Sequence, residues 1–380
     1  MPQEVAPREV VIVQDRVPHY RVAFFGELRD LLRAKGVTLR LLHAHRNERS
    51  EYSAESNFYV DLDWAEPFQK RDLPGGATWY PVLATIKTAD LVIVEAASKR
   101  LLNYALLLLR CIGGPRLAFW GHGWSHKTAR PQGISERVKV WLGKQADWYF
   151  AYTWSVRQGL VERGYDPERI TDVQNAVPKP AVSKVRRDPA AIRKALGIHE
   201  AAPVVLYCGR MYPNKRLDLL VQAIEIVRAT VPEIVLLLVG GGPSEHVARQ
   251  ATASHDYIKY LGPLFGEDKA ELFQIARLVA MPGLVGLGVV DAFQHGVPPV
   301  ATTYPFHSPE FAYLQDGING LVAGDNATEF AEAIRRLVVD DELHRRLEEG
   351  SRFASESITI HEMADRFAGG VLKALGSTGG

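Results

Sequence analysis

The sequence predicts an α/β protein built from two Rossmann-like, doubly wound domains. Short apolar runs typical of buried parallel strands alternate with amphipathic helical segments, and this alternation starts afresh after the proline-bearing polar stretch 178–187. The length of 380 residues fits two domains, and the apolar fraction of 47% is ample for two cores. We place the N-terminal domain at 1–178, the C-terminal domain at 179–360, and a last helix at 361–380 that is long enough to lie across the first domain.

Composition and charge narrow the class of protein. The formal net charge of +1 argues against a dedicated nucleic-acid binder, and Cys111 and Cys208 alone make neither a disulfide framework nor a cysteine metal cluster. The N-terminus lacks the apolar core of a signal peptide, and the apolar run 104–109 is far shorter than the about 20 residues that cross a bilayer. We therefore expect a cytoplasmic protein, with peripheral attachment to the inner face of the membrane left open.

The first domain begins with a strand at 9–14, a loop, and an amphipathic helix that directs residues such as Phe24 and Leu28 inward. Further strands are expected at 37–42, 91–95, 116–120, 148–152 and 170–174, with one helix ending at Leu109 and another at 153–163. Segment 43–78 has no sustained period and is rich in charged and aromatic residues. It is therefore either a long functional loop or an unrecognised short hairpin.

Two features of the first domain point to a ligand. His122 lies between glycines just past the strand 116–120, where open α/β sheets place ligand groups, although a water-exposed turn histidine fits as well. Between 97 and 145 a single acidic residue, Glu136, faces an excess of basic ones. These are Lys99, Arg100, Arg110, Arg116, Lys127, Arg130, Arg137, Lys139 and Lys144. Such a face could hold an anionic lipid surface or a diphosphate-bearing molecule, or simply be solvated.

The second domain carries the strongest signals. Its strands are expected at 204–209, 234–239, 257–262, 278–281 and 299–302, and its helices and the last helix at 189–196, 217–230, 328–338, 342–355 and 361–375. Arg210 can grip phosphate oxygens through its planar guanidinium group, and Lys215 adds a point charge at a helix start. Glycines at 240–242 and 283–288 let backbone N–H groups approach a phosphate. Asp291 could accept hydrogen bonds from both hydroxyls of a ribose. Each motif alone could be an ordinary glycine-rich corner, but their order predicts a nucleoside diphosphate site.

The same motifs carry a resemblance to a known family. GRMYPNKRLDLLVQA, VGGGP, YLGPL and DAFQHGVPPVA succeed one another with the spacing of glycosyltransferase family 4, of the GT-B fold, and PHYRVAFF, WGHGW and ITDVQNAVP are similar to its first domain. The resemblance covers nearly the whole chain and is strongest from Val204 to Ala323. It implies two Rossmann-like domains facing across a cleft, and retaining transfer of a sugar from a nucleoside diphosphate sugar without a metal or other cofactor. Asp61-Leu-Asp63 has the spelling of a metal motif, but it lies in the irregular segment 43–78.

Position by position, the resemblance implies roles for individual residues. Arg210 and Lys215 hold the donor diphosphate and neutralise the leaving group, while His122 lies near the transferred sugar. Asp291 falls where the family has the second of two Glu separated by seven residues. Gly283 falls at the position of the first Glu, so this chain departs from the family there. Our hypothesis is that Glu310 supplies the missing carboxylate. The other expected donor-side residues are Gly209, Gly241, Gly286, Leu287 and Gly288, and the expected acceptor-side residues are Asp15, His19, Arg21 and Trp124.

We therefore predict transfer of a sugar to a glycan or lipid-linked acceptor, in cell-surface polysaccharide or glycoconjugate synthesis. A nucleotide-sugar 2-epimerase would use the same diphosphate site without an acceptor. The departure at Gly283 also allows a pseudoenzyme that only binds the nucleotide sugar. A nicotinamide oxidoreductase fits least, because no strand is followed by Gly-x-Gly-x-x-Gly with an acidic residue about 20 positions later. The sequence leaves the donor base, the sugar, the acceptor and the oligomeric state open.

Overall fold

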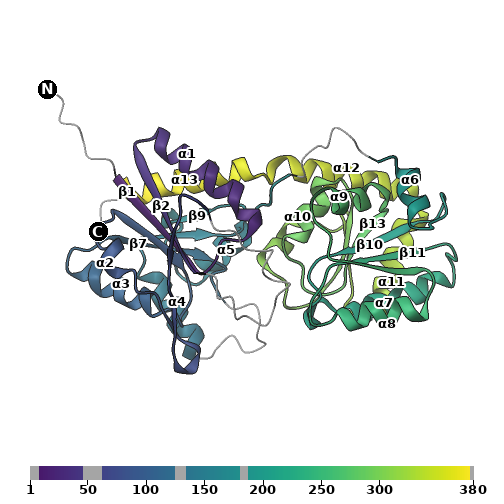
Figure 1. Ribbon diagram of the computed structural model, residues 1–380, viewed down its shortest axis with the longest axis horizontal. Coiled ribbons are helices and arrows are strands. Elements are labelled where there is room, and N and C mark those ends of the chain that lie inside the picture. Colours follow the sequence, from purple (N-terminus) through teal and green to yellow (C-terminus); the bar gives the residue numbers. More distant parts are fainter. Residues whose placement is uncertain (1–7, 46–61, 125–133, 180–186, 377–380) are drawn as a thin grey trace. The chain divides into compact units, whose positions relative to one another are not determined.

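The computed structural model describes residues 8–45, 62–124, 134–179 and 187–376. The chain forms two compact units, one made of 1–178 together with 360–380 and the other of 179–359. Each unit contains a parallel sheet covered by helices (Figure 1). These two Rossmann-like sheets confirm the predicted fold class.

The first unit is organised around a seven-stranded sheet in the order β3-β2-β1-β6-β7-β8-β9, in which every neighbouring pair is parallel. Its central strands are almost entirely buried apolar residues, because helices cover both faces. The strands are β1 (Arg8–Gln14), β2 (Val37–Ala44), β3 (Glu66–Phe68), β6 (Leu91–Glu95), β7 (Arg116–Gly121), β8 (Trp148–Ala151) and β9 (Ile170–Asp172). The helices are α1 (Val22–Ala34), α2 (Leu83–Ile86), α3 (Leu101–Cys111), α4 (Ile134–Lys144), α5 (Trp154–Glu162) and α13 (Ile360–Gly376), with short 3-10 turns at η1 (His19–Arg21) and η4 (Pro167–Arg169).

Segment 43–78 is not one long loop. β3 extends the main sheet beside β2, and β4 (Arg71–Asp72) and β5 (Thr78–Trp79) form a small antiparallel pair around the turn η3 (Pro74–Gly76). The expectation of a long loop is wrong here, and the alternative of a short hairpin is the one that the structure supports. Strands of two or three residues are too short to show a period in the sequence. Residues 46–61, and with them Asp61, lie outside the described residues.

Helix α13, the last of the chain, packs within the first unit along α1 (Figure 1). Phe367 stacks on Phe150 with ring centroids 4.1 Å apart and also meets Phe24 and Trp120 edge-on. Arg116, at the start of β7, donates a hydrogen bond of 2.5 Å to the carbonyl of Ala374. The C-terminal helix thus completes the core that the first 178 residues begin.

The second unit contains a six-stranded parallel sheet in the order β12-β11-β10-β13-β14-β15. Its strands are β10 (Val204–Cys208), β11 (Val235–Val239), β12 (Ile258–Gly262), β13 (Leu278–Met281), β14 (Pro299–Thr302) and β15 (Leu321–Ala323). Its helices are α6 (Pro189–Ala195), α7 (Leu217–Arg228), α8 (Glu245–Ser254), α9 (Gly266–Ile275), α10 (Gly288–Gln294), α11 (Ala327–Val339) and α12 (Asp341–Ser357), with 3-10 turns η5 (Pro213–Lys215) and η6 (Pro309–Tyr313). Among these strands, only the three-residue β15 was not expected from the sequence.

Both sheets have a switch point, where the strand order reverses. In the first unit β1 lies between β2 and β6, and in the second β10 lies between β11 and β13. Loops that leave the two strands at such a point diverge, and ligands of open α/β sheets bind between them. The two switch points are therefore the expected positions of ligand-binding sites.

Candidate functional site

In the second unit, the backbones of the loops after β10 and β13 are in close contact at the switch point. This contact is possible because Gly283 has no side chain. A Cβ atom on Gly283 would lie 2.2 Å from the carbonyl oxygen of Asn214 and 2.8 Å from the carbonyl carbon of Lys215. The N–H of Leu284 donates to the same Asn214 carbonyl at 2.9 Å. The backbone of the β10 loop thus fills the space beside Gly283, so a side chain at this position has no room.

The loop after β11 is held to the β10 loop in the same way. A Cβ on Gly240 would lie 1.8 Å from the Gly209 carbonyl oxygen, and one on Gly242 would lie 2.7 Å from that of Met211. The N–H of Met211 donates to the carbonyl of Gly241 at 2.9 Å. Gly241 itself has space for a side chain, since its nearest neighbour would be Glu245 at 3.5 Å. Three loops after neighbouring strands therefore form one rigid rim.

Lys215 lies in this rim. Its Nζ donates a hydrogen bond of 2.5 Å to the carbonyl of Leu284 in the β13 loop. Burial lowers the pKa of Lys215 to about 8, and the nearby negative charge of Glu310 opposes that shift. A cation held in a poorly hydrated place interacts strongly with an anion that arrives there, because little water screens the pair.

Arg210 lies half-buried on the same loop. Its Nη2 donates to the hydroxyl of Tyr212 at 2.5 Å, and its guanidinium carbon lies 5.1 Å from the centre of the Tyr212 ring. The Tyr207 hydroxyl in turn donates to the Arg210 carbonyl at 2.8 Å, which fixes the backbone. The structure thus brings the two predicted diphosphate ligands, Arg210 and Lys215, onto one short, braced loop.

Asp291 lies in the first turn of α10 and has a partner that the sequence did not reveal. Lys269 on α9 donates to its carboxylate at 2.6 Å. Although burial alone would lower it, the pKa of Lys269 is raised by the Asp291 carboxylate. An ionised carboxylate has about four acceptor positions, so the ion pair leaves capacity for ribose hydroxyls. Lys269 lies 22 residues from Asp291 on another helix, and no local motif signals the pair.

His307 was also missed, and it joins the β13 and β14 loops. Its Nδ1 accepts from the N–H of Val285 at 3.0 Å, which leaves Nε2 to donate to the carbonyl of Thr302 at 2.8 Å. The ring stacks on Phe311, with centroids 3.8 Å apart. Burial lowers the pKa of His307 to about 4, and the positive charge of Lys215 lowers it further. The neutral ring therefore stabilises the β13 loop, which contacts Lys215.

Glu310, our candidate for the missing carboxylate, is buried at the start of η6, with 3% of its surface exposed. Its charge acts on Lys215. The structure thus places Glu310 beside the cation of the predicted diphosphate site. Its contact with the donor sugar stays a prediction.

The neutral state of His307 makes the stability of the second unit depend on pH. In the unfolded chain histidine binds a proton below pH about 6.5, whereas folded His307 does so only near pH 4. Above pH 6.5, the neutral His307 therefore does not lower the free energy of unfolding. As the pH falls toward 4, the free energy of unfolding decreases, by about 3 kcal/mol at most. Urea unfolding between pH 7 and 4.5 should show a steeper loss for the wild type than for His307→Asn. Equal slopes would show that His307 is not held neutral.

In the first unit, His122 lies exposed just past β7, and its ring centroid is 4.5 Å from that of Tyr152. Trp124 packs on α5, with the guanidinium carbon of Arg163 4.1 Å from the centre of its ring. His19 is exposed in η1. The structure thus leaves His19 and His122 accessible and gives Trp124 a packing contact.

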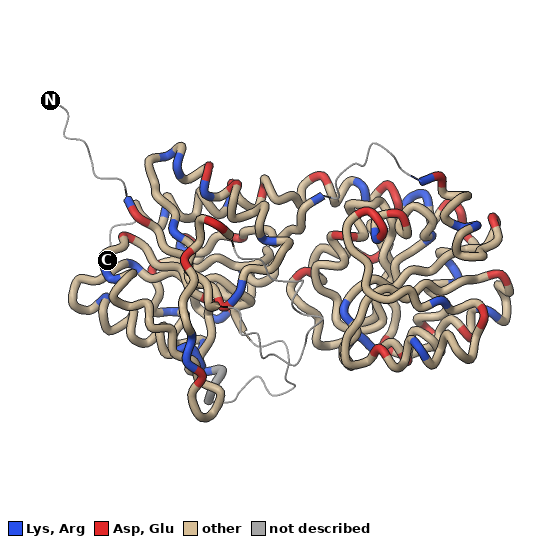
Figure 2. Tube along the Cα trace, viewed as in Figure 1, with Lys and Arg blue, Asp and Glu red and all other residues tan. Residues whose placement is uncertain are grey.

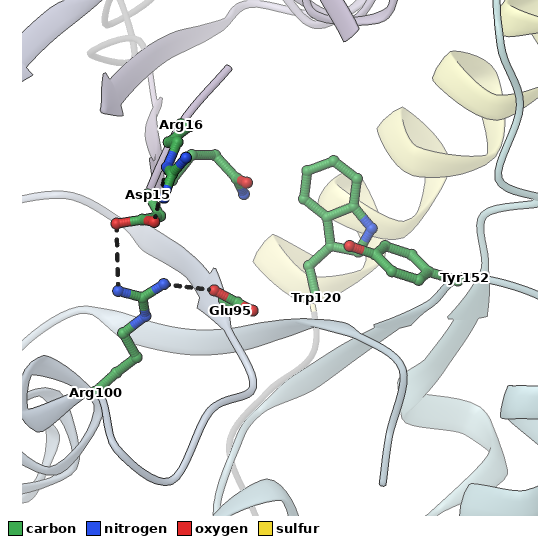
Figure 3. A pocket seen from close by; sticks show the side chains of 7 residues that line it. Asp15, Arg16, Glu95, Arg100, Trp120 and Tyr152 are labelled. Carbon is green, nitrogen blue, oxygen red and sulfur yellow. Dashed lines mark hydrogen bonds and ion pairs between the residues drawn. The ribbon is translucent and has the colours of Figure 1, made fainter. Parts of the chain in front are cut away.

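Asp15 and Arg21 differ sharply in their surroundings. Asp15 lines a cavity of about 300 Å³ at the carboxyl ends of β1, β6 and β7 (Figure 3). Arg21 is only 5% exposed and donates to Asn175 Oδ1 at 2.5 Å and to the sulfur of Met363 at 3.1 Å. Since Tyr152 lines the same cavity and touches His122, this edge of the first sheet brings Asp15 and His122 to one region.

The basic residues between 97 and 145 do not form one surface in the described part of the chain. Arg100 points to the carboxyl edge of the sheet, where it pairs with Asp15. Arg116 lies at the amino end of β7, at the opposite edge, and Arg110 pairs with Asp147. Figure 2 shows Lys and Arg distributed over both units, with Asp and Glu among them. Lys127 and Arg130 lie outside the described residues, and the expectation of a single basic face is not supported by the others.

Comparisons with known proteins find similarity to glycosyltransferases. Residues 202–340 match the family model described as Glycosyl transferases group 1. A D-inositol 3-phosphate glycosyltransferase of Stackebrandtia nassauensis is 30% identical over 220 residues, which are 54% of this chain and 48% of the relative. A GDP-mannose-dependent monoacylated alpha-(1-6)-phosphatidylinositol monomannoside mannosyltransferase of Corynebacterium glutamicum is 32% identical over 169 residues, 42% of this chain and 43% of the relative. The chain spans about half the length of the curated relatives it matches, or less.

A solved structure shares the fold over nearly the whole chain. The crystal structure of Anabaena Alr3699/HepE in complex with UDP has a TM-score of 0.70 at 17% identity, and covers 96% of this chain and 99% of that one. The chain therefore has the GT-B fold of glycosyltransferases. The match to the group 1 family model, at 202–340, lies in the second unit, where the resemblance is strongest. Membership of family 4 stays a prediction.

Proposed function

We propose that the protein is a retaining, metal-independent glycosyltransferase that moves a sugar from a nucleoside diphosphate sugar to a glycan or lipid-linked acceptor. The observation that carries this proposal is the placing of Arg210 and Lys215 on one braced loop at the switch point, with Asp291 in the first turn of the helix that follows the β13 loop. Two relatives are named for glycosyl or mannosyl transfer, and the HepE structure holds UDP.

The chemistry follows from these charges. Breaking the bond between the anomeric carbon and the diphosphate puts negative charge on the phosphate and oxocarbenium character on the sugar. Fixed cations beside the phosphate stabilise this transition state more than the ground state, because the charge that they meet grows during the reaction. Arg210 and Lys215 supply the cations that a metal would otherwise supply. Asp291 then orients the nucleotide through its ribose.

The acceptor and the location belong to the same proposal. The names of the two relatives mention an inositol phosphate and a phosphatidylinositol mannoside, which supports a lipid-linked or glycan acceptor in cell-surface synthesis. Within the described residues, no helix is both long and apolar enough to pass through a bilayer. We propose a cytoplasmic protein that makes peripheral contact with the inner face of the membrane. Leu108 on α3 and Ile112 just past its end are 72% and 81% exposed, and they supply apolar side chains for such a contact.

Calorimetric titration with UDP, GDP and ADP in the presence of EDTA tests the donor site. We expect one of the three to bind with EDTA present, because Arg210 and Lys215 act without a metal. Turnover of the matching nucleotide sugars, with and without added acceptors, then separates the candidate activities. A transferase forms product only with an acceptor, whereas a 2-epimerase needs none. If no nucleotide binds, the proposed function is wrong.

A further inference from the structure

Asp291 has a second charged side chain beside it in the second unit. Lys269, on α9, donates from Nζ to Asp291 Oδ2 at 2.6 Å. The Lys269 side chain is 28% exposed and the Asp291 side chain 19%, so the ion pair is largely buried but still open to solvent. Both charged groups are therefore within reach of a molecule that binds there.

The packing of α9 against α10 fixes the ion pair in place. Phe273, four residues after Lys269, stacks on His295, four residues after Asp291, with ring centroids 4.1 Å apart. Residues four apart lie on the same face of a helix, so the ion pair and the ring stack are two contacts along one helix–helix interface (Figure 1). Lys269 is thus held beside Asp291 by more than its charge.

The ion pair lies near the end of β10, where the loop with Arg210 and Lys215 begins. Burial raises the pKa of the Cys208 thiol, at the end of β10, to about 12, and the charges of Lys269 and Asp291 act on it in opposite directions. A Cβ on Gly288, the first residue of α10, would lie 3.9 Å from the Cys208 carbonyl oxygen. The ion pair and the predicted diphosphate ligands therefore belong to one region of the second unit.

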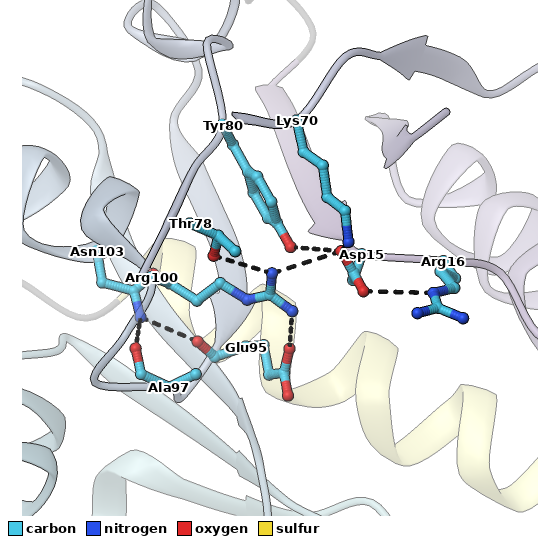
Figure 4. Close-up of polar contacts among 9 residues, drawn as sticks. All are labelled: Asp15, Arg16, Lys70, Thr78, Tyr80, Glu95, Ala97, Arg100 and Asn103. Atoms are coloured by element: carbon cyan, nitrogen blue, oxygen red, sulfur yellow. Dashed lines mark hydrogen bonds and ion pairs between the residues drawn. The ribbon is translucent and has the colours of Figure 1, made fainter. Parts of the chain in front are cut away.

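Lys269 and Asp291 keep free hydrogen-bonding positions. In the described part of the chain, each is the other's one side-chain hydrogen-bond partner. Asp15 in the first unit shows the opposite case, because its carboxylate is shared among several side chains (Figure 4). These are Arg16, Lys70, Tyr80 and Arg100. Since a carboxylate accepts about four hydrogen bonds and an ammonium group donates three, the Lys269–Asp291 pair has both acceptors and donors left for a ligand.

A hydroxyl group matches an acceptor and a donor that lie side by side, because it both donates and accepts hydrogen bonds. A carboxylate alone uses only the hydroxyl hydrogen. The ammonium group of Lys269, 2.6 Å from the carboxylate, supplies a donor for the oxygen of the same hydroxyl. The two hydroxyls of a ribose therefore meet three polar partners here, which are two carboxylate oxygens and one ammonium group.

From this geometry we propose that Lys269 is a second ligand of the nucleotide ribose and makes the site selective for ribonucleotides over deoxyribonucleotides. One ribose hydroxyl donates to Asp291 and accepts from Lys269, and the other donates to Asp291. Loss of the shared hydroxyl leaves two partly buried charged groups each without a partner, and sites of this kind reject such an analogue strongly. The inference rests on the proposed function, because the ligand is the nucleotide of the sugar donor.

Calorimetric titration with three kinds of probe tests the proposal. The probes are UDP, GDP and ADP, the 2′-deoxy and 3′-deoxy forms of each, and inorganic pyrophosphate, which has no ribose. We expect the wild type to bind its preferred ribonucleotide at least about tenfold more tightly than the deoxy form that lacks the shared hydroxyl. Equal affinities for the ribonucleotide and both of its deoxy forms would overturn the proposal.

Lys269→Met assigns this preference to the lysine, because methionine has a similar length and no charge. The variant should bind the preferred ribonucleotide about tenfold more weakly, and only about threefold or less more tightly than the same deoxy form. Its affinity for pyrophosphate should stay within about threefold of the wild type, since Arg210 and Lys215 are unchanged. An unchanged preference for the ribonucleotide, or an equal loss for all three kinds of probe, would contradict a contact between Lys269 and the hydroxyl.

A second background separates a direct contact from an effect through Asp291. In Asp291→Asn, the further change Lys269→Met should still weaken binding of the ribonucleotide about threefold, because the ammonium group contacts the hydroxyl itself. If it causes no further loss, Lys269 acts only by holding the carboxylate, and the proposed contact is wrong. Lys194→Met, in the exposed last turn of α6, is the matched control and should bind every probe as the wild type does.

The same titrations distinguish failure of this inference from failure of the proposed function. If the wild type binds a nucleotide and Lys269→Met binds it equally well, the inference fails while the proposed function stands. If the wild type binds none of the nucleotides, the proposed function is wrong and the inference fails with it.

Discussion

Substitution of Lys215 by alanine is expected to weaken binding of the nucleoside diphosphate by at least about 100-fold and to lower kcat by a similar factor. The ammonium group of Lys215 is held 2.5 Å from the Leu284 carbonyl, in the rim formed by the β10 and β13 loops. Because burial removes it from much of the water, its attraction for a phosphate is only weakly screened. Calorimetry measures the loss of affinity, and steady-state kinetics measures the loss of kcat. Thermal unfolding of the variant checks that the second unit is intact.

The pH dependence of nucleotide binding tests the same residue in the wild type. The pKa of free Lys215 is lowered to about 8 by burial, and a bound diphosphate raises it again. Binding therefore takes up a proton at pH values where free Lys215 is neutral, and the affinity falls as the pH rises through 8. We expect roughly tenfold weaker binding at pH 9 than at pH 7. Lys215→Arg stays charged over this range and should give a flat profile, so a flat wild-type profile would contradict the role of Lys215.

Substitution of Gly283 by alanine is expected to destabilise the second unit by more than about 2 kcal/mol and to abolish nucleotide binding. The added methyl group would meet the Asn214 carbonyl oxygen at 2.2 Å, and this neighbour is backbone, which cannot rotate away. Relief of the contact requires the β10 loop to separate from the β13 loop. Since that loop carries Arg210 and Lys215, the diphosphate ligands move with it.

Gly286→Ala is the matched control for Gly283→Ala, in the same loop. Its methyl group would meet nothing closer than the Ser308 hydroxyl at 3.8 Å, which is an ordinary van der Waals distance. We expect its free energy of unfolding to stay within about 0.5 kcal/mol of the wild type. Urea unfolding of the two variants gives the comparison. If Gly283→Ala proves as stable as Gly286→Ala and still binds nucleotide, the two loops are not in the close contact described.

Local patterns in the sequence predicted most of the fold. The strands around β1 and β10 and the helices α1 and α11 follow from apolar periods several residues long, because burial imposes such a period on any strand or helix that packs on a core. The short strands β3, β4 and β15 were not predicted, because two or three residues carry no period. The presence of Arg210, Lys215 and Asp291 near one switch point also followed from the sequence, because loops after parallel strands meet at one edge of the sheet.

The sequence by itself determined the class of fold and the residues that come after the strands of each sheet, because both depend on neighbours along the chain. Only the tertiary structure decided which of these residues meet. Lys269 pairs with Asp291, His307 joins the β13 and β14 loops, and the backbone at Asn214 occupies the space beside Gly283. These contacts join residues separated by 15 or more positions. Their free energy comes from charge and burial in the folded chain, which no local pattern records.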